Sequence, residues 1–304
     1  MSEMIGRRCP VCDGRQARPH WRKEEITLVQ CAECGMVFAN PVPAAMASGE
    51  HYEQLVEGLY LSADKLAADY APVRFARELR LFREFCPQGR VLDVGCSTGA
   101  FLYQLEAGGP RRYERLGMDV VGPALDHAER QGVPVRRGSF LEYRDEALYD
   151  AVTFWAVVEH LAEPLSFLRQ ASELLRPGGH CFVLVPNLNS LAIRLLGARY
   201  RYVMPEHLNY FTAATLRRWC ARVPELEVVA LRSTHFNPVV IWQDWRGRGR
   251  GVPDAGRVAL LKRTTAWKQR GGLVRSCYQA VERLLGSVQC ADNLVLVARR
   301  LRAG

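Results

Sequence analysis

The sequence lacks three features that would place it in special classes of protein. No stretch approaches the ~18 consecutive apolar residues of a membrane-spanning helix. The first nine residues, Met-Ser-Glu-Met-Ile-Gly-Arg-Arg-Cys, contain no apolar core of an export signal. Internal repeats are also absent, which argues against a repeat architecture. We therefore expect a cytoplasmic protein without a transmembrane segment.

What is present is ordinary globular composition with a basic surplus. Hydrophobic residues make up 48% and charged residues 24% of the 304 residues, enough for one α/β domain with a small appendage. The net charge of +9 suits nucleic acid, an anionic membrane surface or a phosphorylated substrate, but charge alone decides none of these. Much of the surplus follows Arg232, so the basicity is regional.

Four of the ten cysteines form two pairs near the N-terminus. Cys9-Pro-Val-Cys12 and Cys31-Ala-Glu-Cys34 give a C-x2-C, eighteen-residue gap, C-x2-C pattern. Two such knuckles can present four thiolates to one ion, and tetrahedral zinc is the usual occupant. A closed shell of four thiolates leaves no position for water. The pattern predicts a structural Zn²⁺ site in a ribbon over residues 1–45, with a hairpin between the pairs.

A glycine-rich turn follows the first strongly apolar strand pattern, residues 90–95. The turn, Gly95-Cys-Ser-Thr-Gly99, opens a helical segment, as at the ligand edge of a parallel sheet. Ser97 and Ala100 replace two glycines of the dinucleotide fingerprint. Asp93, directly before the turn, would repel a pyrophosphate and favour a cationic ligand. The turn therefore predicts a positively charged nucleoside-like ligand without phosphate.

Asp119 ends the next strand pattern, residues 115–119. A carboxylate at this point of a nucleotide-binding sheet commonly accepts hydrogen bonds from ribose hydroxyls. S-adenosyl-L-methionine meets both demands, since it carries a ribose and a cationic sulfonium.

Two further segments extend this pattern into a family resemblance. The ordered motifs are Val91-Leu-Asp93-Val-Gly95-Cys-Ser-Thr-Gly99, Asp119, Tyr149-Asp150-Ala-Val-Thr-Phe-Trp155-Ala-Val-Val-Glu159-His160-Leu, and Leu175-Arg-Pro177-Gly-Gly179. They resemble those of class I S-adenosylmethionine-dependent methyltransferases over about residues 70–232 and again at the last strand. The resemblance implies an α/β, Rossmann-like sheet of seven strands with the last one antiparallel.

The same resemblance implies a set of cofactor-binding residues. They line the methionine end, the ribose, the adenine and the region after the fourth strand, and they are Asp93, Gly95, Ser97, Gly99, Asp119, Val120, Ser139, Phe140 and Trp155. Two positions depart from the usual pattern. Ser97 stands where many relatives have glycine, and Ser139 where many have aspartate.

Beyond the cofactor half, strands are expected at residues 133–135, 151–155, 180–185, 226–231 and 293–299. A helix is expected over residues 188–199 and another, capped by Thr212, to residue 222. About sixty residues separate the last two strands, which indicates an insertion at about 233–290 of a methyltransferase domain that spans 46–304.

The insertion combines basic residues with tryptophans. It contains the run Arg246-Gly-Arg248-Gly-Arg250-Gly, then Lys262-Arg263, Lys268 and Arg270, and also Trp242, Trp245 and Trp267. Such a segment can contact a phosphorylated or carrier-linked substrate or an anionic membrane face, and it can equally be a helical cap with a solvated basic loop.

Histidines supply the candidate catalytic groups, because methyl transfer needs the acceptor to be oriented and deprotonated. Glu159-His160 follows the fourth strand, and His160 can serve either as a base or as a structural residue. Pro205-Glu206-His207-Leu-Asn-Tyr210-Phe211 resembles a stretch of bacterial zinc-containing sugar C-methyltransferases in which the histidine is the proposed base. Met204 departs from that pattern. The resemblance implies His207 as the base or orienting group, with Glu206 and Tyr210 beside it.

The sequence thus predicts a methyltransferase acting on oxygen or carbon of a small molecule, with sugars, natural products and quinone-like phenols as possible acceptors. RNA methylation is an alternative, because a zinc ribbon and a basic region can bind single strands, although the surplus charge does not lie on the ribbon. A non-catalytic binding protein is a third hypothesis, and the intact motif with Asp93, Gly95, Gly99 and Asp119 argues against it. The oligomeric state is left open.

Overall fold

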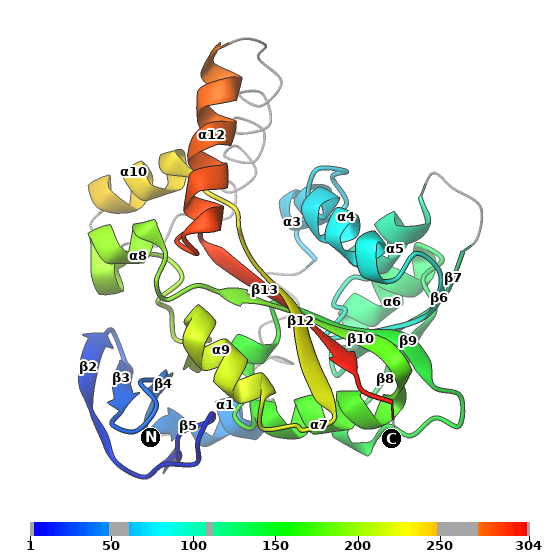
Figure 1. Cartoon of the computed structure of the whole chain (residues 1–304), viewed down its shortest axis with the longest axis horizontal. Coiled ribbons are helices and arrows are strands. Elements are labelled where there is room, and N and C mark those ends of the chain that lie inside the picture. The colour runs from blue at the N-terminus through cyan, green and yellow to red at the C-terminus, as the bar shows by residue number, and fades with distance from the viewer. Residues whose placement is uncertain (1–2, 49–60, 108–111, 248–272, 303–304) are drawn as a thin grey trace.

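The computed structural model describes residues 3–48, 61–107, 112–247 and 273–302, and they form one large β-sheet and two smaller ones with surrounding helices (Figure 1). The larger sheet has seven strands in the order β12-β13-β10-β9-β6-β7-β8. Their bounds are β6 Gly89–Val94, β7 Tyr113–Asp119, β8 Val135–Arg137, β9 Tyr149–Trp155, β10 Leu175–Pro186, β12 Leu226–Thr234 and β13 Asn293–Arg300.

Strand directions in this sheet match the prediction. β8, β7, β6, β9 and β10 pair in parallel, whereas β13 runs antiparallel to both of its neighbours, β10 and β12. The parallel strands require crossover helices, and the intervening segments supply them. The expected seven-stranded α/β class with an antiparallel last strand is confirmed.

Helices cover both faces of the sheet. Their bounds are α1 Ala44–Ser48, α3 Ala63–Asp69, α4 Ala76–Phe85, α5 Ala100–Glu106, α6 Gly122–Arg130, α7 Pro164–Leu174, α8 Leu191–Leu196, α9 Ala213–Cys220, α10 Pro238–Arg246 and α12 Leu273–Ser287, with 3-10 turns η1 Phe140–Glu142, η2 Val158–His160 and η3 Gly197–Arg199. Alternation along the strands sends neighbouring residues into two cores, so Val91 packs with Phe82 while Leu92 packs with Phe154.

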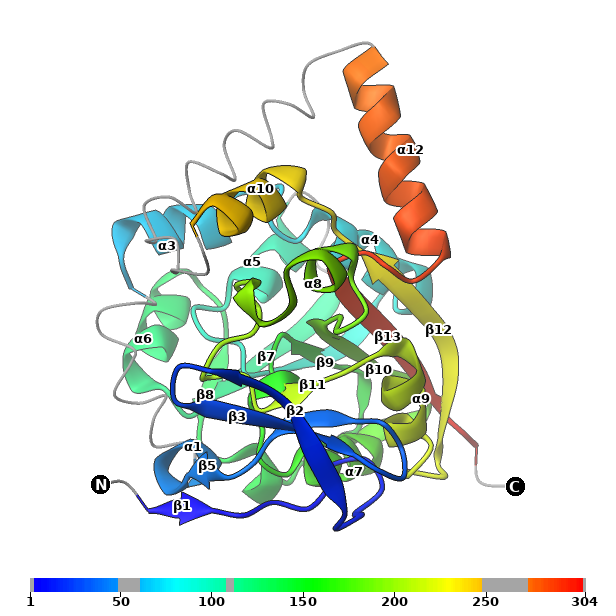
Figure 2. The same cartoon turned by 90° about the vertical axis from the view of Figure 1, so that its left-hand side faces the viewer.

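The N-terminal segment forms a smaller sheet of the order β11-β4-β3-β2. Its strands are β2 Ala17–Lys23, β3 Ile26–Cys31, β4 Val37–Ala39 and, from much later in the chain, β11 Asn209–Tyr210. β1 Met4–Ile5 pairs with β5 Val42–Pro43 nearby. We call residues 3–43 the ribbon. It lies at one side of the large sheet, next to α8 and α9 (Figures 1 and 2).

Two expected elements begin later in the chain than predicted. The third strand was expected at residues 133–135, but β8 starts at Val135, because the Val133 amide donates to Ala128 at the end of α6 and Pro134 has no amide to donate. The helix expected over 188–199 starts only at Leu191, where the Ser190 hydroxyl caps it, and ends at Leu196 before Gly197, whose φ is positive at 57°.

The late insertion contributes α10 and α12 between β12 and β13. Trp242 and Trp245 on α10 are exposed, and the Arg246 guanidinium stacks over the Trp242 ring. Most of the basic run, Arg248, Arg250, Lys262, Arg263, Lys268 and Arg270, lies outside the described residues together with Trp267. Among the described helices, none has the length and apolar character needed to span a bilayer.

Candidate functional site

The glycine-rich turn sits at the carboxyl end of β6, the strand between β9 and β7. Gly95 and Gly99 have positive φ values of 69° and 75°, and Ser97 also has a positive φ of 48°. A Cβ on Gly95 would lie 2.6 Å from Val157, and one on Gly99 would lie 2.8 Å from Ala128. Both conformation and space therefore require glycine at these two positions.

Two carboxylates flank the turn. The Asp93 carboxylate accepts a hydrogen bond from the Thr153 hydroxyl at 2.6 Å, and the Asp119 carboxylate accepts from the Ser97 and Val121 amides at 2.8 and 3.1 Å. Burial, with the nearby charge of Asp119, raises the pKa of Asp93 to about 7, and burial also raises the pKa of Asp119. A buried carboxylate and a partly buried one, both with a raised pKa, form a site that favours a cationic ligand.

The other predicted cofactor residues lie around this edge in different settings. Val120 is exposed after β7, and Ser139 precedes η1. The Phe140 side chain is buried in the core against Phe154 and Phe167, with ring centroids 5.7 and 5.6 Å apart. The Trp155 ring packs on Phe101 at 5.0 Å, and its Nε1 is buried with no hydrogen-bond partner among the described residues.

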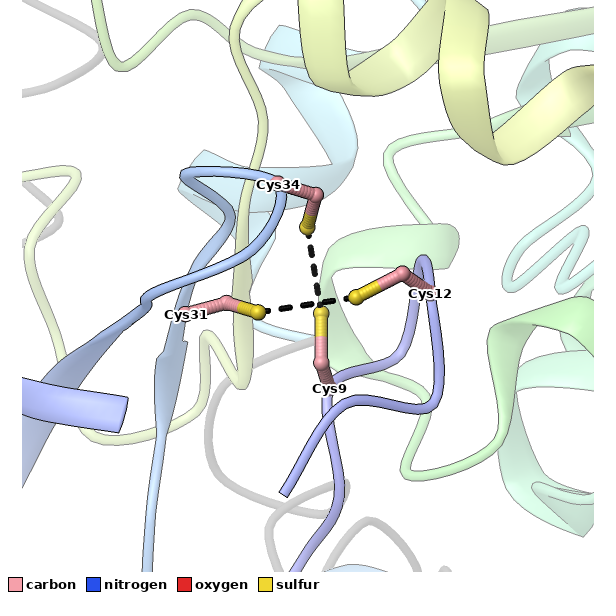
Figure 3. Close-up of side chains that lie close together, drawn as sticks. All are labelled: Cys9, Cys12, Cys31 and Cys34. Atoms are coloured by element: carbon pink, nitrogen blue, oxygen red, sulfur yellow. Dashed lines mark hydrogen bonds between the residues drawn. The ribbon is translucent and has the colours of Figure 1, made fainter. Parts of the chain in front are cut away.

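The four ribbon cysteines converge at one point, as Figure 3 shows. The Sγ atoms of Cys9 and Cys34 are 3.4 Å apart, those of Cys12 and Cys31 are 3.5 Å apart, and all four lie within 4.8 Å of one another. A tetrahedral ion with Zn–S bonds of about 2.3 Å would place the sulfurs roughly 3.8 Å apart. The donor set and its dimensions fit one Zn²⁺.

The structure brings His160 and His207 together from segments 47 positions apart in the chain. Their rings meet edge to face, with centroids 4.7 Å apart. The His160 Nδ1 lies 2.8 Å from the Glu206 carbonyl oxygen, and the His207 Nδ1 lies 2.9 Å from that of Tyr202. Burial lowers the pKa of His160 to about 4 and lowers that of His207 well below its ordinary value. Both rings are therefore neutral at physiological pH.

The histidine pair is connected to the glycine-rich turn at residues 95–99 through Val157. His160 belongs to η2, which directly follows β9, and Val157 just before it is the residue that a Cβ on Gly95 would strike. Glu159 between them is 1% exposed, and burial raises its pKa to about 8.

The two remaining catalytic candidates, Glu206 and Tyr210, support the loop that carries His207. Glu206 offers its backbone carbonyl to His160. The Tyr210 hydroxyl donates to the Met204 carbonyl at 3.1 Å and accepts from the Met204 amide at 3.3 Å. With both hydrogen-bonding roles of its hydroxyl occupied within the loop, Tyr210 fixes the shape of the loop.

Two residues that the sequence did not single out hold this loop against η2. The Asn209 side-chain amide donates to the Val158 and Leu161 carbonyls at 2.9 and 2.7 Å. Arg7 of the ribbon donates to the Ala162 carbonyl at 2.7 Å and to the Asn209 side-chain oxygen at 2.9 Å. In the sequence, the only feature that could have pointed to either residue is the position of Asn209 inside the Glu-His-Leu-Asn-Tyr stretch.

The ribbon also contacts the loop that carries His207. β11 pairs antiparallel with β4, with Asn209 opposite Phe38 and Tyr210 opposite Val37, and Lys23 donates to the Val203 carbonyl at 2.7 Å. Arg218 on α9 donates to the Cys34 carbonyl, and Arg222, just after α9, donates to the Val11 carbonyl, so each cysteine knuckle accepts one of these hydrogen bonds. The ribbon therefore scaffolds the His207 loop.

Comparison with known proteins gives a family for this architecture. Residues 68–230, more than half of the chain, match the model of the methyltransferase domain family. The chain is similar to the ubiquinone biosynthesis O-methyltransferases of Leptothrix cholodnii and Aeromonas salmonicida, with 32% and 30% identity over 49% of this chain and 69% and 68% of those proteins.

Solved structures agree on the fold. The 1,6-didemethyltoxoflavin-N1-methyltransferase of Burkholderia thailandensis, with bound S-adenosylhomocysteine, aligns with 94% of this chain and all of that one, at a TM-score of 0.52 and 16% identity. At that identity the likeness concerns the fold alone. Together with the family match and the sequence relatives, these observations show that the chain belongs to the methyltransferase domain family and is an S-adenosylmethionine-dependent methyltransferase.

Proposed function

We propose that this enzyme methylates a hydroxyl oxygen of a small molecule. The observation that carries the proposal is the pair of neutral imidazoles, His160 and His207, beside the cofactor turn. The relatives named above are O-methyltransferases of ubiquinone biosynthesis, which favours oxygen over carbon and a phenol-like acceptor over a sugar. Neither RNA methylation nor a non-catalytic role is favoured by these relatives.

The proposed cofactor site follows the carboxyl edge of the sheet. Asp93, Gly95, Ser97 and Gly99 would hold the methionine end, where the buried carboxylate of Asp93 attracts the cationic groups. Asp119 would accept the ribose hydroxyls, with Val120 beside it. Ser139, the backbone of Phe140 and the Trp155 region would border the adenine and the reacting methyl group.

On the acceptor side we propose that His207 deprotonates or orients the acceptor hydroxyl, while the His160 ring packs against the His207 ring. Methyl transfer requires the acceptor oxygen, the methyl carbon and the sulfonium in line, so positioning is the main contribution of the protein. The Glu206 carbonyl and the Tyr210 hydroxyl hold these rings and their loop in place.

We further propose that Cys9, Cys12, Cys31 and Cys34 bind one structural Zn²⁺ per chain. Four thiolates close the coordination shell, so the metal has no open position for chemistry. Its contribution is the fold of the ribbon and, through β11, the geometry of the His207 loop.

The test is an acceptor screen with S-adenosylmethionine and zinc-loaded protein. Catechol-type phenols, polyols, nucleotide-linked sugars and single-stranded RNA are offered in parallel, and products are assigned by mass spectrometry and by NMR of the transferred methyl group. We expect a methoxy product from a phenolic acceptor. Methylation of only carbon, nitrogen or RNA would contradict the proposal.

A further inference from the structure

Asp292 lies directly before β13, the antiparallel last strand. Because β13 runs against both of its neighbours, its first residue, Asn293, pairs with Pro186 at the end of β10 and with Thr234 at the end of β12. The carboxyl ends of the parallel strands form the ligand edge of such a sheet. Asp292 is therefore placed at the same edge as the glycine-rich turn, where the late insertion returns to the sheet.

Main-chain hydrogen bonds fix the position of Asp292 at this edge. Its amide donates to the His235 carbonyl at 2.8 Å, and its carbonyl accepts from the Asn187 amide at 2.9 Å. The Asn187 side-chain amide also donates to the carbonyls of Gln289 and Ala291, at 2.9 and 2.8 Å. The two ends of the insertion are thus joined to each other and to the end of β10, so the backbone that carries the Asp292 carboxyl group is held on both sides.

The Asp292 carboxyl group is buried and forms no ion pair among the described residues. Asp292 is 4% exposed, and its Oδ1 is buried without a hydrogen-bond partner in the described part of the chain. Arg201, whose charge acts on Asp292, is bound to the Asp244 carboxylate at 2.7 Å. Burial raises the pKa of Asp292 to about 7, although the Asn237 amide and the Tyr200 hydroxyl favour its charged form. A cationic group on a ligand would supply the missing partner.

The insertion brings a second carboxyl group to this corner of the sheet. Glu282 on α12 acts on Asp292 through its charge, and its Oε1 is buried without a hydrogen-bond partner among the described residues. Its other oxygen pairs with Arg77 of α4. Figure 1 shows that α12 rises from the end of the sheet where β13 begins. Because Arg77 compensates Glu282, the charge left without a counter-ion in this corner is that of Asp292.

Two tyrosines connect Asp292 to the His207 loop. The Tyr200 and Tyr202 rings meet edge to face with centroids 5.2 Å apart, and the Tyr202 and His207 ring centroids are 6.4 Å apart. Burial and the charge of Asp292 raise the pKa of Tyr202 to about 12, and the charge of Glu159 adds to this rise. The Tyr202 hydroxyl is therefore within reach of both Asp292 and η2. Aromatic rings beside a carboxylate are the groups that recognise an ammonium ion.

We propose that Asp292, together with Tyr200 and Tyr202, binds a protonated amine of the acceptor while the hydroxyl to be methylated lies at His207. This inference rests on the proposed O-methyltransferase function and names its substrate class, a phenol or related hydroxyl compound that also carries an amine. The ammonium group becomes the counter-ion of Asp292 and donates to its Oδ1. Asp292 contacts the amine and not the reacting oxygen, so it determines specificity and takes no part in the transfer itself.

Matched pairs of ligands test this amine site by binding. Phenols with a terminal amine on alkyl chains of increasing length, of which tyramine is the shortest, are each compared with the alkylphenol in which a methyl group replaces the ammonium. Calorimetry uses zinc-loaded full-length protein with S-adenosylhomocysteine bound, at about pH 8, where Asp292 is ionised and the amine is protonated. We expect at least one amine to bind about 10- to 100-fold more tightly than its alkyl partner.

Three variants show whether Asp292 is the origin of this preference. Asp292→Asn keeps the size of the side chain and should reduce the preference to about threefold or less. Tyr200→Phe removes the hydroxyl that favours the charged carboxylate and should lower the preference less than Asp292→Asn does. Asp126→Asn, which removes an exposed carboxylate on α6, is the matched control and should bind as the wild type does.

Unchanged S-adenosylhomocysteine affinity verifies that each variant is folded, and Tyr200→Phe carries the test where Asp292→Asn does not fold. No preference for the amine at any chain length in the wild type overturns the amine site. A preference that is equal in the wild type and in the folded variants of Asp292 and Tyr200 overturns it as well.

Product analysis separates this proposal from the proposed function. With S-adenosylmethionine, the preferred amine should have a KM at least tenfold below that of its alkyl partner, with a similar kcat, and should give the methoxy product. Equal KM values with methoxy products from both members of each pair would overturn the amine site and leave the proposed function intact. Amine binding that depends on Asp292, in a protein that methylates no hydroxyl, would support the amine site and overturn the proposed function.

Discussion

The glycine-rich turn and the His207 loop are connected through residues 157–160 but are constructed in different ways. The turn is one short segment, residues 93–99, completed by Asp119 at the end of the next strand. The loop depends on three distant segments, since Arg7, strand β4 and Val158 of η2 all contact residues 208–210. A site on a single turn needs little beyond its own sheet, whereas the loop needs the ribbon. We therefore expect damage to the ribbon to disable acceptor chemistry and spare cofactor binding.

Cys12→Ser should produce the largest difference between the two regions. Structural zinc contributes an apparent ~10–16 kcal/mol in small zinc modules, so loss of one thiolate should unfold much of the ribbon. We expect turnover to fall by about 1,000-fold or more, while S-adenosylhomocysteine affinity, measured by calorimetry, changes less than about threefold. The zinc content is measured by elemental analysis in both proteins. A reduced, folded wild type without stoichiometric zinc would contradict the metal assignment itself.

His207→Ala disrupts the acceptor side without touching the ribbon cysteines. Loss of a group that deprotonates or orients the acceptor should lower kcat by about 100-fold or more, with cofactor affinity nearly unchanged. Steady-state kinetics with a saturating cofactor make the measurement, and His180→Ala serves as the control. A variant that keeps wild-type turnover and loses only thermal stability would show that His207 merely packs the loop.

Asp119→Ala disrupts the cofactor side alone. Removing a carboxylate that accepts two ribose hydrogen bonds should cost roughly 1.5–3 kcal/mol of S-adenosylmethionine affinity, about 10- to 150-fold. Asp126→Ala, on α6, is the control. NADH should not bind either protein, because the turn offers carboxylates where a pyrophosphate would lie. Equal cofactor affinity in wild type and Asp119→Ala would refute the assignment.

The smallest expected effect is a pH dependence of S-adenosylhomocysteine affinity that arises from Asp93. Its pKa of about 7 in the unliganded protein exceeds the ordinary value, so Asp93 stabilises the fold below the ordinary pKa and this contribution is lost as pH rises through about 7. A cationic ligand favours the carboxylate and would expel the proton. S-adenosylhomocysteine, which retains the ammonium group, should therefore bind about tenfold more tightly at pH 8 than at pH 6. Calorimetry in two buffers of different ionisation enthalpy measures the released proton, and Asp93→Asn should abolish the pH dependence.

The contrast between the regions also explains what the sequence could predict. The approximate positions of the strands and the glycine-rich turn could be predicted, because periodicity and glycine spacing are local signals, and the antiparallel last strand followed from the family resemblance. The four cysteines were accessible through their spacing. The pairing of β11 with β4 and the contacts of Arg7 and Asn209 were not, because they depend on residues up to 202 positions apart. The contact between His160 and His207 could not be predicted for the same reason, since no local pattern joins η2 to that loop.

Hydrogen–deuterium exchange of the cofactor-bound protein, with the ribbon intact or broken, tests the dependence of the loop on the ribbon most directly. Zinc-loaded wild type and Cys12→Ser are compared peptide by peptide, with S-adenosylhomocysteine in excess. Our account predicts that amides at 203–211 lose protection strongly in Cys12→Ser, because β11 loses its partner β4, while amides at 91–100 exchange as before. Unchanged protection at 203–211, or an equal loss at 91–100, would contradict it.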